Sequence, residues 1–524
     1  MSEGQVLYAH GDRGFDFYLV LDGQIDLYDE CPGDPRRHRH IVTYSRHQYT
    51  GELALLNGQT SLVRTVARGG TRVVRLTPAQ LRSLLAEEPE IARTVLRSFI
   101  LRRRSYIQHG VGSLMVAGDP SEGRVLGIIT FLRRNGYPFT VIDTRHPEGR
   151  TELAGRGVDP GAVLPVVLYG QGEYAADPDP RHLAGLLGLT DTLESGQVFD
   201  VAVVGAGPAG LAAAVYAASE GLLTIVIESD APGGQAGTSS MIENYLGFPL
   251  GLSGQSLASR AEVQARKFGA RIALPCTVRQ LDCSTRPFTL RLDDGNSVRS
   301  RTVVVATGAK YRRLNVAGLE RFEQNGVHYA ATSLEAALCS DAEVVVVGGA
   351  NSAGQAAVFL SQHAHHVHML VRGDSLSATL SHYLRERIDA APRITVHVRT
   401  EIAELEGSHC LEQVHWVNRR TGERTVKPVA GAFLMLGAVP NTVWLHGCLD
   451  LDTHGFVRVG PEAAPAGGET EDASCWGALQ TSVPGVFAVG DVRAGSVKRV
   501  ASAVGEGAMV ISAVHEALAN VDRR

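Results

Sequence analysis

The chain has 524 residues, too many for a single hydrophobic core, so three or four domains are expected. Its hydrophobic share of 44% is that of an ordinary globular protein, and its formal net charge of -5 offers no electrostatic footprint for nucleic acid. No apolar run is long enough to span a bilayer and no secretory signal pattern is present, so we expect a cytoplasmic protein without membrane partners.

The cysteines contain no C-x-x-C pair, which fits a reducing compartment and excludes a redox disulfide between sequence neighbours. They are Cys31, Cys276, Cys283, Cys339, Cys410, Cys448 and Cys475.

Residues 1–110 are predicted to form a β-roll followed by a helix. Residues 17–28 and 63–76 alternate as strands do, and residues 78–104 carry a helical apolar stripe. The stretch resembles the cyclic-nucleotide-binding β-roll, whose phosphate cassette would be Gly51-Glu52-Leu53. In that family the Glu binds the ribose and an Arg about ten residues later pairs with the cyclic phosphate. Leu62 stands near the Arg position and Arg64 two residues further on. Because a phosphate needs a guanidinium there, we expect a docking or dimerisation module, with nucleotide binding as the alternative.

Residues 111–190 are predicted to form a small α/β domain. Strands are expected at 113–116, 139–143 and 164–168, and helices at 122–134 and 182–187. The order resembles the thioredoxin or glutaredoxin fold, in which a proline such as Pro165 is cis. The loop at 117–122, where that family has its redox cysteines, contains no thiol. This domain is therefore predicted to be an adaptor, and residues 190–197 a linker.

A dinucleotide fingerprint follows. Residues 201–204 predict a buried parallel strand, Gly205, Gly207 and Gly210 form a G-x-G-x-x-G turn, and a helix opens after it. A second strand, 223–227, ends in Glu228, where a carboxylate would hold a ribose hydroxyl. The combination of strand, turn, helix and acid predicts a dinucleotide site.

From residue 198 onward the chain resembles a low-molecular-weight thioredoxin reductase. The motifs in family order are residues 232–235 (PGGQ), 242–249 (IENYLGFP), 303–309 (VVVATGA), 344–353, 437–442 and 484–491. The resemblance implies two doubly wound domains in a homodimer, with a nicotinamide domain (317–436) inserted between the two parts of an FAD domain (198–316 and 437–524).

The resemblance also assigns FAD contacts. Asp491 would hold the ribityl chain, and residues 499–505 would follow over the isoalloxazine. The expected contacts are Gly205, Gly207, Pro208, Ala209, Gly210, Glu228, Gly234, Gln235, Asn244, Thr307, Gly308, Gly490, Asp491, Arg499, Val500 and Ala501.

The second fingerprint predicts a nicotinamide-nucleotide site with one departure. Ala350 replaces the middle glycine, so a methyl group would crowd the pyrophosphate. The second strand, 367–371, ends in Arg372 rather than an acid, which favours NADPH, with NADH as the alternative. The family's further arginines are missing at Gly373 and Ser377. The expected contacts are Gly348, Gly349, Asn351, Ser352, Ala353 and Arg372.

The largest departure is catalytic. Ala330 and Ser333 occupy the two positions of the family's redox cysteines, so flavin-to-disulfide transfer by that route is excluded and no catalytic residue is assigned. Cys339 is expected to be an isolated core thiol. The group His363, His365, His366 and His368 runs from a helix end into a strand and is not expected to bind metal.

Two functions remain open. The first is an enzyme that takes hydride from NAD(P)H and passes electrons to an unknown acceptor, which could be a small redox protein, without a local disulfide. The ferredoxin-NADP reductases of thioredoxin-reductase type, which lack the cysteines, follow such a route. The second is a flavin-bearing sensor or adaptor with decayed reductase activity.

Overall fold

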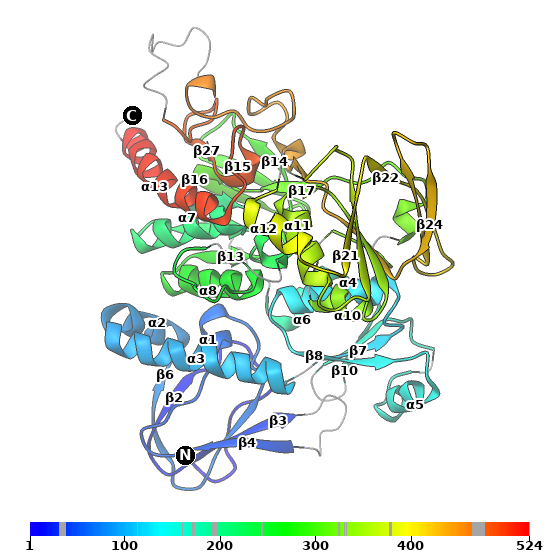
Figure 1. Cartoon of the computed structure of the whole chain (residues 1–524). Helices are drawn as coiled ribbons and strands as arrows, with labels where there is room; N and C mark the ends of the chain where they lie inside the picture. The colour runs from blue at the N-terminus through cyan, green and yellow to red at the C-terminus, as the bar shows by residue number, and fades with distance from the viewer. Residues whose placement is uncertain are drawn as a thin grey trace.

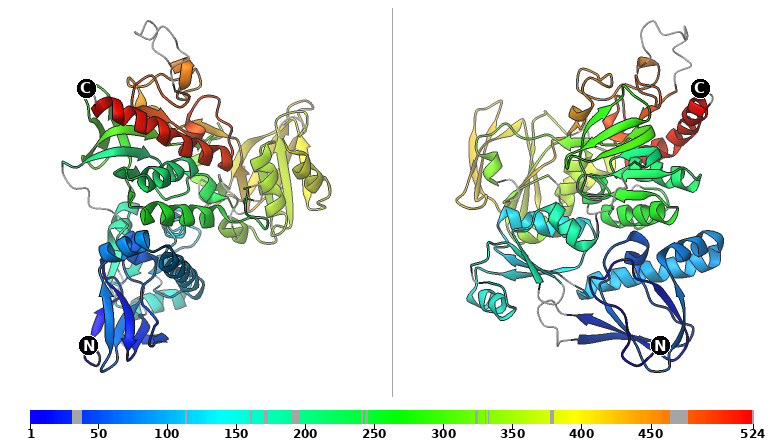
Figure 2. Two further views of the ribbon diagram at one scale, coloured as in Figure 1. Left: turned by 90° about the vertical axis from the view of Figure 1, so that its left-hand side faces the viewer. Right: turned by 180° about the vertical axis from the view of Figure 1, so that it is seen from behind.

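The computed structural model describes residues 1–30, 38–112, 114–159, 161–169, 173–189, 196–239, 242, 245–322, 325–329, 331, 333–376, 380–463 and 477–522. The N-terminal β-roll (blue) lies below the flavin-type unit (green and red), and the second dinucleotide-type unit (yellow) lies beside that unit (Figure 1). Views from the side and from behind give the same arrangement (Figure 2). Among the described helices, none has the length and apolar character needed to cross a bilayer.

The described part of the β-roll contains two sheets and three helices. The first sheet has the order β1 (Val6–Tyr8), β5 (Arg64–Ala67), β3 (Ile25–Glu30) and β4 (His38–Tyr44), and the second pairs β2 (Phe17–Asp22) with β6 (Arg72–Leu76). The strand pattern predicted over residues 17–28 is confirmed as two strands, β2 and β3, which belong to different sheets. The helices are α1 (Leu53–Asn57), α2 (Pro78–Glu87) and α3 (Pro89–His109). The predicted helix at 78–104 is thus two helices, because Pro89 disfavours a helical residue before it and begins a new helix.

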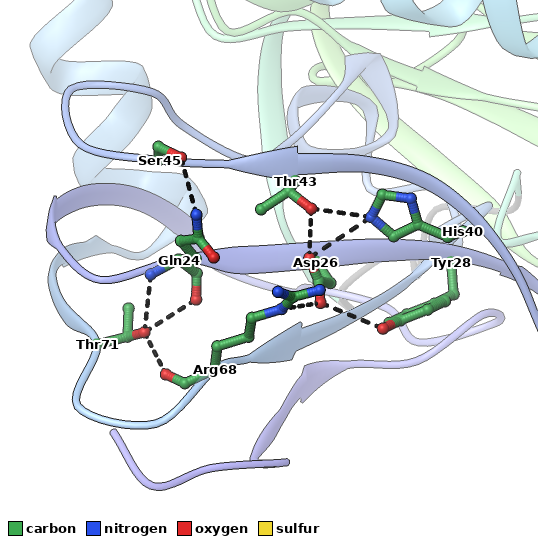
Figure 3. A network of polar contacts seen from close by, with 8 residues as sticks. All are labelled: Gln24, Asp26, Tyr28, His40, Thr43, Ser45, Arg68 and Thr71. Atoms are coloured by element: carbon green, nitrogen blue, oxygen red, sulfur yellow. Dashed lines mark hydrogen bonds and ion pairs between the residues drawn. The ribbon is translucent and has the colours of Figure 1, made fainter.

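A buried carboxylate joins strands on the outer side of the roll (Figure 3). Asp26 is 3% exposed, and it accepts hydrogen bonds from Thr43 Oγ1 (2.6 Å), Arg68 Nε (2.5 Å) and Tyr28 Oη (3.2 Å). Burial by itself raises the pKa of Asp26, but these hydrogen bonds outweigh it and the pKa lies below 3.8. The network therefore stabilises the ionised carboxylate.

The second domain has a four-stranded sheet of order β10-β9-β7-β8, in which β7 and β8 are parallel. The Leu164–Pro165 peptide bond is cis. Helix α5 and strand β10 were not predicted, because α5 buries no residue and β10 is a short edge strand. The elements are β7 (Leu114–Gly118), α4 (Gly123–Arg134), β8 (Phe139–Asp143), α5 (Pro147–Gly155), β9 (Val166–Tyr169), β10 (Glu173–Ala176) and α6 (Pro180–Leu187).

The flavin-type unit is built on a seven-stranded sheet of order β13-β12-β11-β16-β15-β14, with β27 alongside β16. Its strands are β11 (Val198–Val204), β12 (Thr224–Ile227), β13 (Arg271–Ala273), β14 (Val278–Asp282), β15 (Phe288–Leu292), β16 (Ser297–Val305) and β27 (Val486–Ala488). Its helices are α7 (Pro208–Ser219), η1 (Ala236–Thr238), α8 (Gly254–Lys267), η2 (Val443–Leu445), η3 (Gly460–Ala463), η5 (Gly490–Val492) and α13 (Val500–Asp522). Helix α7 packs against both α8 and α13.

The elements of the second unit lie between β16 and β27 in the sequence. Its sheet has the parallel order β18-β25-β19-β20-β21, and β17 (Ala309–Tyr311) pairs with β26 (Ala438–Pro440) where the chain leaves and re-enters the flavin-type unit. The strands are β18 (Val327–His328), β19 (Glu343–Val347), β20 (His366–Val371), β21 (Ile394–Val398) and β25 (Gly431–Leu434), with β22 (Thr400–Glu406), β23 (Gln413–Asn418) and β24 (Arg424–Pro428) in an antiparallel meander. The helices are α9 (Leu319–Phe322), α10 (Ser333–Leu338), α11 (Asn351–Leu360) and α12 (His382–Asp389).

A disulfide joins Cys283, just after β14, to Cys448, just after η2. The two Cα atoms are 6.1 Å apart, and the residues are separated by 165 positions in sequence. The cysteine spacing gave no sign of this bond, which joins residues remote in sequence and is therefore not the local redox pair that the absence of C-x-x-C excludes.

Candidate functional site

The first fingerprint forms a tight turn at the end of β11. Gly205 has φ +105°, and a Cβ on it would lie 2.4 Å from the carbonyl oxygen of Ala306. A Cβ on Gly210 would lie 1.9 Å from the carbonyl oxygen of Gly205. Only glycine therefore fits at either position. A Cβ on Gly207, in contrast, would meet no atom within 4 Å, so this residue borders open space at the N-cap of α7. Pro208 begins the helix, and Ala209 is buried behind it.

Glu228 lies at the end of β12, next to this turn. Its Oε2 accepts a hydrogen bond from the backbone N–H of Ala206 (2.7 Å), and its Oε1 accepts one from that of Asp230 (3.0 Å). Burial raises the pKa of Glu228, and the two N–H groups partly offset that effect. The predicted ribose acid is thus oriented by backbone on both of its oxygens.

The loop at 232–235 folds back over the fingerprint. Gly233 N donates to Ala206 O (2.7 Å), and a Cβ on Gly234 would lie 3.1 Å from Cα of Gly207. Gln235 Nε2 donates to the carbonyl oxygen of Ala309. Gly234 and Gln235 therefore lie beside the turn, whereas Asn244 lies outside the described residues.

The return strands bring the remaining flavin motifs to the same edge of the sheet. Thr307 Oγ1 donates to Asn441 O (2.9 Å), and Asn441 N donates to Gly308 O (3.0 Å). These bonds join the two crossing segments of the flavin-type unit.

The C-terminal motif is held by a glutamate that sequence reasoning missed. Glu506 of α13 accepts hydrogen bonds from Gly490 N (2.7 Å) and from the Arg493 guanidinium. Asp491 is half-buried, and burial raises its pKa while Lys498 lowers it. Arg499 and Ala501 are exposed and Val500 is half-buried at the start of α13. Glu506 gave no signal because its partner lies 16 residues earlier, around a turn.

The second fingerprint has the same construction. Gly348 has φ +141°, and a Cβ there would lie 2.4 Å from Met435 O. Ala353 is buried, as close packing of helix on strand requires. Ala350 is the exposed N-cap of α11, with extended φ of -98°. Gly349 and Asn351 are half-buried and Ser352 is exposed. Asn351 Oδ1 accepts a hydrogen bond from Ser381 N (2.7 Å), which fixes the start of α12.

Arg372 is exposed immediately after β20, at the carboxyl end of the second unit's sheet. Asp374 forms an ion pair with Arg399. Ser377 lies outside the described residues. Two histidines of the group that was considered as a metal site make contacts with other side chains. His368 contacts Glu343 (2.8 Å) and His397 (3.1 Å), and His366 contacts Thr395 (2.8 Å).

The region of the missing redox cysteines is only partly described. Ala330 lies outside the described residues, and Ser333 begins α10. Cys339 is 1% exposed, and burial raises its pKa to about 12. A thiol with that pKa is not a nucleophile near neutral pH. The prediction of a core thiol is therefore confirmed.

The nucleotide cassette of the β-roll contains an ion pair from the chain itself. Glu52 is 2% exposed and lies 3.5 Å from Arg103 Nη1 of α3, which is also buried. Burial raises the pKa of Glu52, and Arg103 lowers it in part. Leu62 is fully buried against Gly112, and Arg64 pairs with Glu30 (3.2 Å).

Two family models match this chain, one over the β-roll and one over the two dinucleotide-type units. The cyclic nucleotide-binding domain matches residues 1–88, and the pyridine nucleotide-disulphide oxidoreductase family matches residues 199–507, more than half of the chain. The chain belongs to the pyridine nucleotide-disulphide oxidoreductase family. Membership makes it an FAD-dependent oxidoreductase and implies FAD and a nicotinamide nucleotide in general terms.

Relatives of this oxidoreductase are reductases and a dehydrogenase. "NADPH-dependent thioredoxin reductase 3" of Arabidopsis thaliana is 35% identical over 315 residues, 59% of this chain and 56% of the Arabidopsis protein. "NADH dehydrogenase" of Bacillus subtilis is 29% identical over 398 residues, 76% of this chain and 73% of that protein. The crystal structure of Lactococcus lactis thioredoxin reductase matches with a TM-score of 0.55 at 27% identity, covering 62% of this chain and 99% of that one.

Proposed function

We propose that the chain takes reducing equivalents from NADPH onto FAD and passes them to an acceptor without using a disulfide next to the flavin. The single observation that carries the proposal is the first fingerprint. It retains the two glycines that no other residue can replace, together with an open Gly207 and an oriented Glu228. Gly207 in particular is not required by packing, since a Cβ there would meet no atom within 4 Å, so a ligand that approaches the backbone is the reason we give for it.

The residues present fit FAD. Gly207 leaves open space at the N-terminus of α7, where backbone N–H groups and the helix dipole favour a pyrophosphate. Glu228 keeps lone pairs for ribose hydroxyls beyond the two N–H groups that orient it. Asp491, held through Gly490 by Glu506, would accept from the ribityl chain. When bound, FAD supplies the hydride and electron chemistry that no side chain of this protein offers.

The second fingerprint supports NADPH as the donor. Gly348 and Ala353 retain the tight turn and close packing, and Arg372 is exposed at the end of β20, where its guanidinium would pair with a 2′-phosphate. A preference for NADH would require an acidic residue at the end of that strand, and Arg372 stands there instead.

The thiols support a route that does not use disulfides. Ala330 and Ser333 cannot form thiolates, and Cys339 is buried with a raised pKa. The Cys283–Cys448 disulfide follows β14, which is three strands from β11, about 14 Å at the usual strand spacing. We therefore assign this disulfide a structural role, in which it links two segments of the flavin-type unit. Quinones, ferricyanide, oxygen or a small redox protein without a thiol requirement are the acceptors that this arrangement suits.

A sensor with decayed reductase activity is the second candidate, and one observation favours it. Ala350 puts a methyl group at the exposed N-cap where the nucleotide pyrophosphate must approach. A methyl group lowers affinity but does not close the site, so we rank the enzyme first.

Anaerobic flavin reduction distinguishes the two. The purified chain should contain about one FAD per protomer, and stopped-flow mixing with NADPH should bleach the flavin absorbance on the timescale of enzymatic turnover, about 1–100 per second. NADH should react more slowly. A flavin that is bound but is reduced by neither nucleotide would favour the sensor, and a chain that cannot be loaded with FAD would refute both.

A further inference from the structure

The turn at 133–137 of the thioredoxin-like domain touches two other parts of the chain. On one side it meets the flavin-type unit. The Arg134 guanidinium forms an ion pair with Asp230, and its Nη2 lies 3.4 Å from Gly234 O. Gln255 of α8 donates to the carbonyl oxygen of Arg133. Asn135 Nδ2 also lies 3.4 Å from Asp230 O.

The residues that Arg134 contacts belong to the predicted FAD loop. Asp230 donates its backbone N–H to Glu228 Oε1 at 3.0 Å, so the position of Asp230 sets the orientation of the predicted ribose acid. Gly234 lies against Gly207, which borders the predicted pyrophosphate space. Arg134 thus connects the two ends of a loop, one at the ribose and one at the pyrophosphate.

On its other side the same turn contacts residues of the β-roll. Arg103 Nη2 donates to Gly136 O (2.9 Å), and its guanidinium lies 5.2 Å from the centre of the Tyr137 ring. Tyr137 Oη forms a hydrogen bond with Thr60 Oγ1 in the cassette segment. Arg103 also pairs with Glu52 of the cassette. This buried guanidinium therefore connects the cassette to the turn at 133–137.

We propose that Arg134 is a positioning residue for the FAD-ribose carboxylate Glu228, and that Arg103 of the β-roll keeps Arg134 in place. The proposal rests on the FAD site proposed above and extends it to two domains outside the flavin-type unit. Arg134 acts through Asp230, whose side chain it holds while the Asp230 N–H holds Glu228. The thioredoxin-like domain, which has no thiol in its expected redox loop, thereby serves the flavin site as a clamp.

The clamp should have a modest effect on affinity. The side chain of Asp230 is about half exposed, so solvent screens the ion pair. We expect Arg134→Gln to raise the FAD dissociation constant of the apoprotein roughly threefold to tenfold, with Arg134→Lys recovering part of the loss. Arg103→Met should weaken FAD binding in the same direction, and the effect should vanish in an Arg134→Gln background.

The test is a fluorescence titration of the full-length apoprotein with FAD, with the melting temperature of each apoprotein measured alongside. Arg124→Gln is the matched control, since Arg124 lies on the same helix and pairs with Asp177 inside its own domain. It should leave the FAD dissociation constant unchanged. A purely structural role would lower the melting temperature in both variants without separating their FAD affinities, and that result would overturn the proposal.

A double-mutant cycle keeps the test decisive if Arg134→Gln folds poorly. Asp230→Asn alters the clamp from the flavin side, and it should match Arg134→Gln in effect without adding to it. Additive effects would overturn the clamp. If the parent itself binds no FAD, the proposed function fails, whereas a parent that binds FAD as tightly as all of these variants refutes the clamp alone.

Discussion

Gly207 and Ala350 occupy the same structural position, the extended N-cap residue of the first helix in their respective dinucleotide units. Their φ angles of -70° and -98° are open to any residue, so backbone strain does not explain the glycine at one and the alanine at the other. The two proposed nucleotide sites differ instead in the room at this position. Gly207 leaves it open, and Ala350 places a methyl group there.

Replacing Ala350 by glycine should therefore improve nicotinamide-nucleotide binding. We expect the NADPH concentration for half-maximal flavin reduction to fall roughly threefold to tenfold, with little change in the limiting rate, because the methyl group affects ground state and transition state alike. Stopped-flow reduction over a range of NADPH concentrations measures both. Gly207→Ala is the reciprocal variant and should weaken FAD retention instead. An unchanged half-saturation in Ala350→Gly would show that the methyl group does not crowd the nucleotide.

Arg372→Ala should change the choice of nucleotide. An exposed guanidinium pairing with a 2′-phosphate typically contributes about 1–2 kcal/mol, so the NADPH dissociation constant should rise about tenfold while that for NADH stays constant. Arg399→Ala is a suitable control, because Arg399 is engaged with Asp374. Equal losses for both nucleotides would contradict the role given to Arg372.

The turn of the first fingerprint could be predicted from the sequence because the residues that form it lie close together in the chain. Gly205 and Gly210 are five residues apart, and the structure shows a backbone contact between them that leaves no room for a side chain. The pairs that sequence reasoning missed are remote. Glu506 and Gly490, Arg103 and Glu52, and Cys283 and Cys448 are brought together only by the packing of separate elements. Helix α5 was missed for a different reason, since it buries nothing and therefore carries no apolar period.

Thioredoxin reduction should fail in the parent, whereas ferricyanide reduction should persist. A dithiol route needs two cysteines that alternate between the flavin and the partner, and Ala330 and Ser333 remove both. NADPH-dependent turnover with the two acceptors, in the parent and in Cys339→Ser, measures the difference. Loss of a robust disulfide turnover in Cys339→Ser would reveal a thiol route through that residue, against its burial and raised pKa.

Cyclic AMP and cyclic GMP should not bind with micromolar affinity. Leu62 is buried under Gly112, Arg64 is paired with Glu30, and the Glu52 carboxylate faces Arg103. Calorimetry with the full chain gives the dissociation constants. If a cyclic nucleotide does bind tightly, Arg64→Ala would test whether that guanidinium leaves Glu30 to meet the phosphate, and Arg39→Ala would serve as the surface control.

The stability of the β-roll should depend on pH through Asp26. Its folded pKa lies below the ordinary value of 3.8, so the folded state favours the ionised form more than the unfolded state does. This contribution is complete above the unfolded pKa and is lost as the pH falls from about 4 toward the folded pKa. In Asp26→Asn the β-roll should be less stable at pH 7 by about 1–3 kcal/mol, because Arg68 and Thr43 lose a charged acceptor. The variant should also lack this part of the acid dependence.

Native-state hydrogen exchange of the amides in β3, measured between pH 3 and 7, reports the stability of the β-roll without requiring the other domains to unfold. Glu87→Gln, at an exposed acid of α2, should keep the parent's profile. A parallel loss of acid dependence in both variants would place its origin elsewhere than the Asp26 network.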